Sequence, residues 1–347
     1  MFFVDPPLYF SIDSWPKLRE LNTTGTRDKG VYIAPTGQTF YFKTSIKQGK
    51  KDYPFEFWSE IAAHRLGLLL GLPVLPYHIA SCNDKIGCIS QNMIDLRTEE
   101  LIEGVNLIIQ FDPNFREECK TNHHFYKIEN ALKLVGLIEY RRIAVEMVLF
   151  DCIIGNTDRH SENWALIRNK VGETYYSELK KKNLFARIKE YWRFHKEFGI
   201  KLIKVPKLLA FIRHRFAPFY DNGSSLGREL SEERIKLLLS DENAFYKFFS
   251  NGKSDIIFEE TKKSFLETID YLLIHFPDEC KHFITKHLSR YNKEHLISSI
   301  NNMDANYPSQ GFDYGRISNN RKQFIVKLID SRISFIYQKI QEYGHEI

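Results

Sequence analysis

The hydrophobic pattern of the chain changes near residue 96, and this change constrains the fold more than any other feature of the sequence. Before it, short β-rich runs alternate with turn residues, which is typical of strands. After it, apolar residues recur at three- and four-residue spacing, which is typical of amphipathic helices. The sequence therefore predicts an α+β fold, with a small β-rich lobe (residues 1–95) followed by a larger, mostly helical lobe (residues 96–347).

Three segments carry the signals of the first lobe. Residues 30–44 read as a β-hairpin that turns near Gly37, and residues 74–94 as two further short strands. Residues 54–72 start behind a proline and predict a helix that ends near Gly71.

Four segments carry the helical signals of the second lobe. Residues 132–154 predict one helix, and residues 231–240 begin with a serine that can cap a helix N-terminus. Long amphipathic stretches follow at residues 258–276 and 320–343. Neither an internal repeat nor a low-complexity tract interrupts these segments.

Composition places the chain among soluble globular proteins. Its 347 residues are 43% hydrophobic and 27% charged, and no apolar run approaches the roughly 18 residues that a membrane span needs. The first residues lack the basic and apolar regions of a secretory signal. The five cysteines are scattered and form no CxxC pair, which favours a reducing compartment. We therefore expect a cytoplasmic protein without a transmembrane segment.

Positive charge is concentrated in one segment. The net charge is +5, yet residues 168–215 hold fourteen Lys and Arg against four Asp and Glu, a surplus of ten that leaves −5 for the rest. Aromatic residues recur between these cations at roughly helical spacing. Three interpretations of the basic segment at about 170–215 stay open: a helix packed on the large lobe with a solvated face, a docking surface for an acidic protein or tRNA, and a peripheral membrane contact.

Five polar residues, each ordinary by itself, stand in an informative order. Lys43 ends the strand-like run TFYFK, and Glu60 lies in the predicted helix at 54–72. The segment GNTDRHSENW holds Asp158 and Asn163 with four residues between them, directly after an apolar run, and Asp221 opens DNGSS after FAPFY. Phosphoryl transfer needs a strand lysine for the phosphates, a helix acid to orient it, an acid near the acceptor hydroxyl, and an amide and an acid for Mg²⁺. The order therefore predicts a phosphotransferase.

The same motifs give a resemblance to a known family. FDCIIGNTDRHSENWALI and FAPFYDNGSSL, together with TFYFKT, FWSEIAAHRLGLLLGLPV and NNRKQFIVKLIDSRISFI, resemble the HipA-like serine/threonine kinases. The resemblance implies a protein-kinase-like two-lobed fold, use of ATP and Mg²⁺, and transfer of the γ-phosphate to a protein Ser or Thr. Because the chain has no room for the extra N-terminal domain of the longest members, it resembles the short ones.

The resemblance also implies roles for individual residues. Asp158 is expected to be the catalytic base, Asn163 and Asp221 to bind Mg²⁺, and Lys43 to hold the ATP phosphates with Glu60 as its partner. His160 is included among the catalytic residues because, with Arg159, it matches the D-R-H pattern and is expected to shape the loop. NTTGTRDKG falls where a phosphate-covering loop is expected, so its residues are candidates for nucleotide binding (Thr24, Gly25, Thr26) and for autophosphorylation (Thr23, Thr24, Thr26).

Family members include toxins with a cognate antitoxin, kinases of aminoacyl-tRNA synthetases and secreted effectors. The implied partners are a protein substrate, such as a translation factor or an aminoacyl-tRNA synthetase, and a small antitoxin protein, in a bacterial cytoplasm or after secretion as an effector. Two alternatives remain: a phosphoinositide or lipid kinase, which uses a similar loop, and a catalytically inactive kinase-fold binding protein. Trp164 is expected to begin the strand that anchors the catalytic loop.

Overall fold

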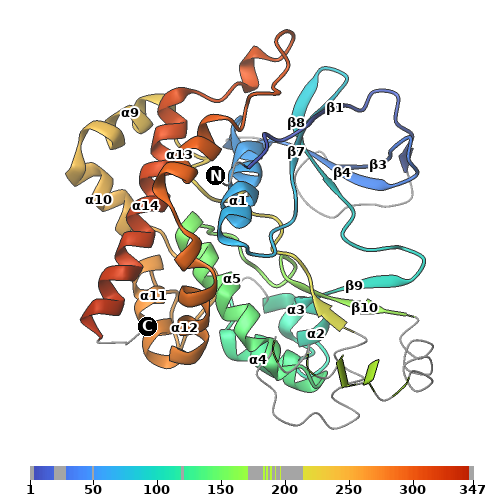
Figure 1. Cartoon of the computed structure of the whole chain (residues 1–347), viewed down its shortest axis with the longest axis vertical. Helices are drawn as coiled ribbons and strands as arrows, with labels where there is room; N and C mark the ends of the chain where they lie inside the picture. Colours follow the sequence, from blue (N-terminus) through green and yellow to red (C-terminus); the bar gives the residue numbers. More distant parts are fainter. Residues whose placement is uncertain are drawn as a thin grey trace.

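The protein folds into two lobes, a β-rich one and a helical one (Figure 1). The account rests on a computed structural model that describes residues 4–18, 29–48, 51–118, 121–170 and 214–343, with a few single positions between 183 and 196. The predicted α+β class and two-lobed arrangement are confirmed.

The first lobe is built on a six-stranded sheet with the order β1-β7-β8-β4-β3-β2, in which only β1 and β7 run parallel. Its strands and a small neighbouring hairpin have these bounds: β1 Tyr9–Ser11, β2 Lys17–Leu18, β3 Lys29–Ile33, β4 Thr39–Thr44, β5 Lys47–Gln48, β6 Lys51–Asp52, β7 His78–Cys82 and β8 Lys85–Gln91. The predicted hairpin at residues 30–44 and the two strands within 74–94 are confirmed.

Helix α1 (Glu56–Leu70) lies between this sheet and the helical lobe (Figure 1). It ends where predicted, because Gly71 adopts a left-handed conformation (φ 68°) that glycine tolerates without steric cost. Two hydrogen bonds join it to the helical lobe: the Trp58 indole donates to the carbonyl oxygen of Gly315 (2.8 Å), and Arg65 Nε donates to that of Ser299 (2.6 Å). Trp58 and Arg65 are about two helical turns apart, so they lie on the same face of α1. Most residues of α1 are therefore buried, the polar ones included.

The second lobe consists mainly of helices around a core that is continuous with α1. Its elements are β9 Glu99–Glu103, α2 Gly104–Ile108, α3 Phe115–Glu118, α4 Phe125–Leu134, η1 Ile138–Tyr140, α5 Arg141–Ile154, β10 Ala165–Asn169, β11 His214–Phe216, α9 Glu232–Ser240, α10 Glu242–Asn251, α11 Phe265–His275, α12 Pro277–Lys286, η2 Leu288–Arg290, α13 Lys293–Asn301, η3 Asp313–Gly315 and α14 Asn319–Glu342. Among the residues described, no helix combines the length and the apolar character needed to cross a membrane.

Two helix predictions were wrong in extent. The stretch 132–154 is not one helix, because the chain turns at Gly136 (φ 75°) between α4 and α5. The stretch 258–276 is helical only from Phe265, where Ser264 and Glu267 form a capping box. Local capping geometry decided both boundaries, whereas the apolar periodicity ran across them.

The segment from α5 to β10 carries the motif GNTDRHSENW. Gly155 ends α5 in a left-handed conformation (φ 69°). The expected strand β10 follows the loop but begins at Ala165, one residue after the buried Trp164. β10 is the middle strand of a three-stranded sheet with β9 and β11. The loop 155–164 is therefore anchored by a helix at one end and a strand at the other.

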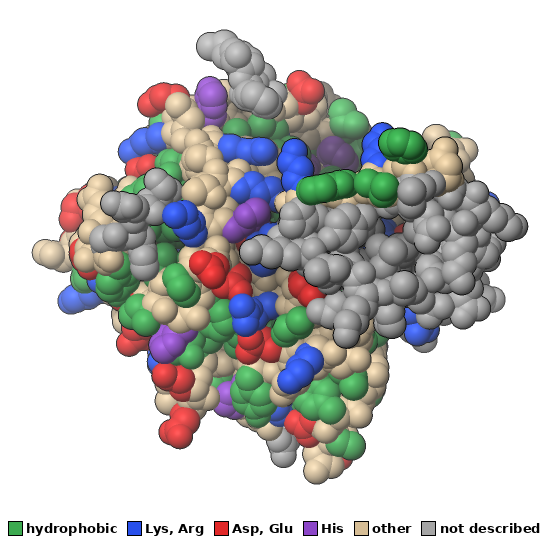
Figure 2. All heavy atoms as spheres, turned by 60° about the horizontal axis from the view of Figure 1, so that its bottom comes forward, with side chains coloured by type: hydrophobic (Ala, Val, Ile, Leu, Met, Phe, Trp, Pro, Cys, Tyr) green, Lys and Arg blue, Asp and Glu red, His purple; other side chains and the backbone are tan. Residues whose placement is uncertain are grey.

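Most of the basic segment at 170–215 lies outside the described residues, so its three interpretations stay predictions. On the face of the molecule in Figure 2, the described Lys and Arg side chains are interspersed with Asp and Glu. This agrees with the sequence, in which the surplus of positive charge belongs to that segment and not to the remainder.

Candidate active site

Lys43, Glu60 and Asp221 meet although they are far apart in the sequence. Lys43 Nζ donates to Glu60 Oε1 (3.2 Å) and to Asp221 Oδ1 (3.1 Å), and it also lies 3.4 Å from the hydroxyl of Tyr77. β4 supplies the lysine and α1 the glutamate, whose side chain is almost completely buried. The three residues that the sequence analysis assigned to phosphate and metal binding therefore form one ion-pair cluster between the lobes.

The turn at Asp221 is held by the same glutamate. The second carboxylate oxygen of Glu60 accepts the backbone N–H of Asn222 (2.8 Å). Asp221 has a positive φ of 55°, which is uncommon for a residue other than glycine. This conformation costs energy, which contacts with neighbouring residues must offset. Burial, with the Glu60 charge adding to it, raises the pKa of Tyr77 well above its usual value, so this hydroxyl stays protonated beside the cluster.

The loop from Asp158 to Asn163 is closed by its own polar groups. Asn163 Nδ2 donates to the carbonyl oxygen of Asp158 (2.7 Å), and the Asp158 backbone N–H donates to Asn156 Oδ1 (3.2 Å). The Ser224 hydroxyl donates to Asp158 Oδ2 at 3.2 Å. Because Ser224 lies three residues after Asp221, this bond joins the loop to the segment that carries the candidate metal-binding acid.

Arg159 joins the two loops from inside. Its guanidinium binds both carboxylate oxygens of Asp151 (2.8 and 2.7 Å). It also donates to the carbonyl oxygens of Asn163 (2.7 Å) and Tyr220 (2.6 Å) and to Asn222 Oδ1 (2.7 Å). Burial disfavours its charge, but Asp151 outweighs this and raises the pKa of Arg159 above its usual value. The residue that the sequence analysis expected to shape the loop is the structural link between Asp158–Asn163 and Asp221.

Sequence reasoning missed three residues of this arrangement: Asp151, Asn222 and Tyr77. Asp151 lies inside the apolar run of α5 and is 2% exposed. A lone acid in such a run is the signal that could have indicated a buried partner, since charged groups are rarely buried unless paired. Asn222 lies inside the motif DNGSS, directly after Asp221, but that motif was interpreted through its acid alone. Tyr77 lies in a strand-like segment with no comparable signal.

His160 is not part of the ion-pair cluster. Its Nδ1 accepts the backbone N–H of Glu162 (3.3 Å) and lies 3.9 Å from the Glu162 carboxylate. Within the described part of the chain, no hydrogen bond connects its ring to Asp158 or Asn163. A different histidine, His123, lies behind the loop and accepts the indole N–H of Trp164 (3.2 Å); burial lowers its pKa to about 3, so it is neutral.

Thr24, Gly25 and Thr26 lie outside the described residues, as does Thr23. Of the expected nucleotide-binding residues, Lys43 and Glu60 are therefore the two that can be placed. The oxygen atoms available for Mg²⁺ are those of Asp221 and the amide Oδ1 of Asn163, because the amide Nδ2 is already bonded to Asp158. Carboxylate and amide oxygens suit this hard cation, so the residues present fit the metal.

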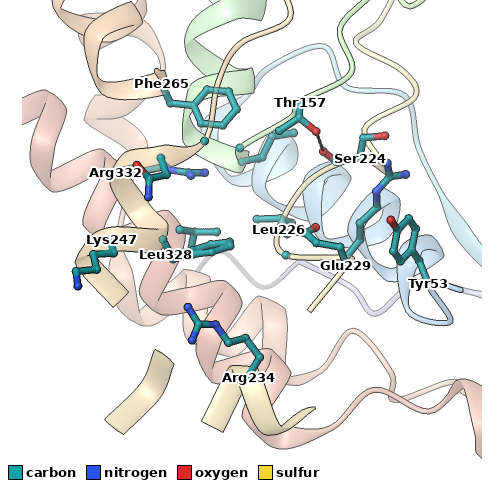
Figure 3. A pocket seen from close by; sticks show the side chains of 17 residues that line it. Tyr53, Thr157, Ser224, Leu226, Glu229, Arg234, Lys247, Phe265, Leu328 and Arg332 are labelled. Atoms are coloured by element: carbon teal, nitrogen blue, oxygen red, sulfur yellow. Dashed lines mark hydrogen bonds between the residues drawn. The ribbon is translucent and has the colours of Figure 1, made fainter. Parts of the chain in front are cut away.

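A cavity of about 500 Å³ opens beside the candidate catalytic loop, with Gly155 and Thr157 in its lining. Figure 3 shows Thr157 and Ser224 on one side of it, and Arg234, Lys247 and Arg332 reaching it from α9, α10 and α14. Arg234 and Lys247 are exposed, whereas Arg332 is buried and donates to the carbonyl oxygen of Ile153 (3.3 Å). The lining also holds Arg228 and one acid, Glu229, so cations outnumber acids around the cavity. Since Ser224 also contacts the Asp158 carboxylate, the cavity is adjacent to the candidate base.

The fold and the site together define a chain with the architecture of a protein kinase. The crystal structure of the Helicobacter pylori proinflammatory kinase CtkA matches 99% of this chain and 100% of its own with a TM-score of 0.67 and 16% identity. HipA of the Shewanella oneidensis MR-1 toxin–antitoxin system, in its complex with HipB and operator DNA, matches 92% of this chain and 65% of its own (TM-score 0.48, 11% identity).

A third match, the Golgi casein kinase, covers 99% of this chain and 76% of its own (TM-score 0.37, 10% identity). No protein-family model matches the sequence, and no curated protein matches it either. At these identities the likeness to CtkA establishes the fold. The two-lobed kinase fold implied by the resemblance to HipA-like kinases is thus confirmed.

Proposed function

We propose that the protein is an ATP- and Mg²⁺-dependent serine/threonine protein kinase of the HipA-like type. The observation that carries the proposal is the joining of two groups of residues: the Lys43–Glu60–Asp221 cluster and the Asp158–Asn163 loop, linked through Arg159. These are the parts that phosphoryl transfer requires, since its catalysis depends mainly on positioning and electrostatics.

In this proposal, Lys43 holds the α- and β-phosphates and Glu60 keeps its ammonium group in place. Asp158 accepts the proton of the acceptor hydroxyl as the hydroxyl oxygen attacks the γ-phosphorus. The bond from that phosphorus to the β–γ bridging oxygen breaks, and ADP leaves with the electron pair. Asn163 and Asp221 would hold Mg²⁺, which when bound would neutralise charge at the phosphate oxygens.

The resemblance also supplies the setting that we propose. The acceptor is a protein, such as a translation factor or an aminoacyl-tRNA synthetase, and a small antitoxin is the regulatory partner in a bacterial cytoplasm. A role as a secreted effector is the alternative setting. Autophosphorylation in the segment 22–30 is part of the same proposal.

Removal of Mg²⁺ tests the proposal. Incubation with γ-labelled ATP and Mg²⁺ should label the protein itself or an added protein, and a chelator in excess should abolish labelling until Mg²⁺ is restored. Acid hydrolysis of the product should release phosphoserine or phosphothreonine. Labelling of phosphoinositide vesicles, with none in protein, would instead support a lipid kinase.

The cavity beside Ser224 leads to a prediction about acceptors. Because Arg234 and Lys247 are exposed at its rim, acceptor peptides with acidic residues next to the Ser or Thr should bind better than neutral ones. Replacing both with glutamate (Arg234→Glu, Lys247→Glu) should raise KM for an acidic peptide about tenfold, equivalent to about 1.4 kcal/mol. The kcat should stay unchanged, since neither residue contacts the ion-pair cluster.

Steady-state kinetics on an acidic and a neutral peptide measure this effect. The double variant Lys281→Glu, Lys293→Glu, which makes the same change in charge on α12 and α13, provides the control. An equal rise in KM for both peptides, or a rise in the control, would show that the cavity does not select acidic acceptors.

A further inference from the structure

Three ligand-type side chains converge on one point of the helical lobe, outside the candidate active site. Glu146 belongs to α5, His282 to α12, and His287 immediately precedes η2. Glu146 Oε1 lies 3.6 Å from His282 Nε2 and 3.8 Å from His287 Nε2, and all three atoms lie within 4.8 Å of one another. Glu146 and His287 are buried, being 4% and 1% exposed.

Each of these atoms is buried without a hydrogen-bond partner among the described residues. Native proteins rarely leave buried polar atoms unsatisfied, and such groups often mark a missing water or ion. Here three unsatisfied atoms from two histidines and a carboxylate face the same space. A convergence of this kind is what a metal ion accounts for.

The histidine tautomer agrees with this explanation. His287 Nδ1 lies 3.0 Å from the carbonyl oxygen of Leu70, the last residue of α1. Because a carbonyl oxygen only accepts, Nδ1 carries the hydrogen and Nε2 presents its lone pair to Glu146 and His282. Metal-binding histidines usually have this arrangement, in which the second ring nitrogen donates to a carbonyl or carboxylate.

We propose that Glu146, His282 and His287 bind a zinc ion. Zn²⁺ takes histidine nitrogen and carboxylate oxygen at about 2.0–2.2 Å in tetrahedral geometry, which places ligand atoms about 3.3–3.6 Å from each other. The distances of 3.6 and 3.8 Å from Glu146 Oε1 are close to this range, and the two histidine nitrogens lie within 4.8 Å of each other, so the side chains must close around the ion. His282 is partly exposed and gives the ion a path from solvent, and a water molecule completes the four ligands.

Two positive charges compete with the ion, those of Arg142 and Lys286. Arg142 Nε lies 3.8 Å from Glu146 Oε1, one helical turn away on α5. Neutralising this guanidinium removes repulsion from the metal, so Arg142→Gln should tighten zinc binding while the three ligand substitutions weaken it. A rise in zinc affinity in Arg142→Gln, together with a fall in the three ligand variants, distinguishes a metal site from a general loss of structure.

The site lies where it can stabilise the placement of α1. Through His287 and the Leu70 carbonyl, the ion would tie α5 and α12 to the end of the helix that carries Glu60. We therefore expect zinc to raise the midpoint of thermal unfolding, because a ligand that binds only the folded state stabilises it.

Zinc titration of the full-length, chelator-treated chain against a chromophoric competitor tests the proposal, with Mg²⁺ in excess to occupy the active site. We expect one equivalent of Zn²⁺, with affinity reduced about a hundredfold or more in Glu146→Gln, His282→Gln and His287→Gln. His275→Gln, a change at an exposed histidine of α11, should leave the affinity as in the wild type. Circular dichroism of each variant establishes that it is folded.

Cobalt substitution of the wild-type chain gives a second readout that needs no variant. Visible absorption bands typical of low-coordinate Co²⁺ should appear when Co²⁺ is added to the chelator-treated chain. They should disappear when Zn²⁺ is then added and displaces the cobalt. Absence of stoichiometric zinc binding would overturn the proposal. So would binding that survives all three ligand substitutions but is lost in Asp221→Ala, because the ion would then occupy the active site. Neither result bears on whether the protein is a kinase.

Discussion

Replacing Asp158 with alanine should reduce transfer of the γ-phosphate by about a hundredfold or more, the usual scale for loss of a positioned general base. The bonds within the loop should persist, because they use the Asp158 backbone and the Asn163 side chain. The substitution removes one bond to the neighbouring segment, the one that the Ser224 hydroxyl donates to Asp158 Oδ2. Single-turnover transfer from γ-labelled ATP measures the loss. Binding of ATP, followed by calorimetry, should change little, since Lys43 and Asp221 are untouched.

The matched control is Asp84→Ala, which removes an exposed acid in the turn between β7 and β8. It should transfer phosphate at the wild-type rate. If Asp158→Ala retained wild-type single-turnover rates, Asp158 would not be the base. If it lost ATP binding as well as transfer, its role would be structural and not that of a base.

Replacing Arg159 with methionine should lower the free energy of unfolding by about 3–5 kcal/mol, the scale expected when one partner of a buried ion pair is removed. The substitution leaves the Asp151 carboxylate charged and buried, with Asn156 Nδ2 (3.0 Å) as its remaining side-chain donor. It also removes the donors to the carbonyl oxygens of Asn163 and Tyr220. Urea denaturation with a two-state fit gives the change.

A double-mutant cycle separates the ion pair from the other bonds of Arg159. Asp151→Leu combined with Arg159→Met removes the unpaired charge, so the double variant should be more stable than Arg159→Met alone. It should not reach wild-type stability, because the carbonyl oxygens and Asn222 still lack their donor. If the losses of unfolding free energy in the two single variants simply added in the double variant, Asp151 and Arg159 would not be strongly coupled. That result would contradict the geometry.

The burial of α1 has a consequence for regulation. In protein kinases the strand lysine and helix glutamate must be paired for activity, and positioning of the helix controls this. Here Trp58 and Arg65 join one face of α1 to the helical lobe at two points, and Glu60 binds the Asn222 backbone as well as Lys43. Regulation of the proposed activity through a movement of α1 would therefore require breaking buried contacts. This favours regulation through other segments of the chain.

Much of the site could be anticipated from the sequence because kinase residues keep a fixed order and local setting. The lysine at a strand end, the acid in a helix and the D-x-x-x-x-N loop can each be found from short-range patterns. Their meeting in space could not be derived that way, since Lys43 and Asp221 are brought together by the packing of two lobes.

The residues that the sequence analysis did not find were hidden for a common physical reason. Asp151 and Asn222 function through contacts with Arg159, and buried polar networks leave no periodic signal in the sequence. Glu146 and His287 are similarly separated, with no metal-binding spacing to indicate them. The break at Gly136 was hidden because a glycine is tolerated within a helical pattern, so the pattern alone did not show that α4 and α5 are separate helices.

The most direct test of the central claim is single-turnover transfer of labelled γ-phosphate by the wild-type chain and by the double variant Asp158→Ala, Asp221→Ala. If both acids belong to one phosphotransfer site, the wild type should label a Ser or Thr acceptor, and the double variant should lose about as much activity as the worse single variant. Labelling by the double variant at the wild-type rate would contradict the account, because the chemistry would then lie elsewhere in the protein.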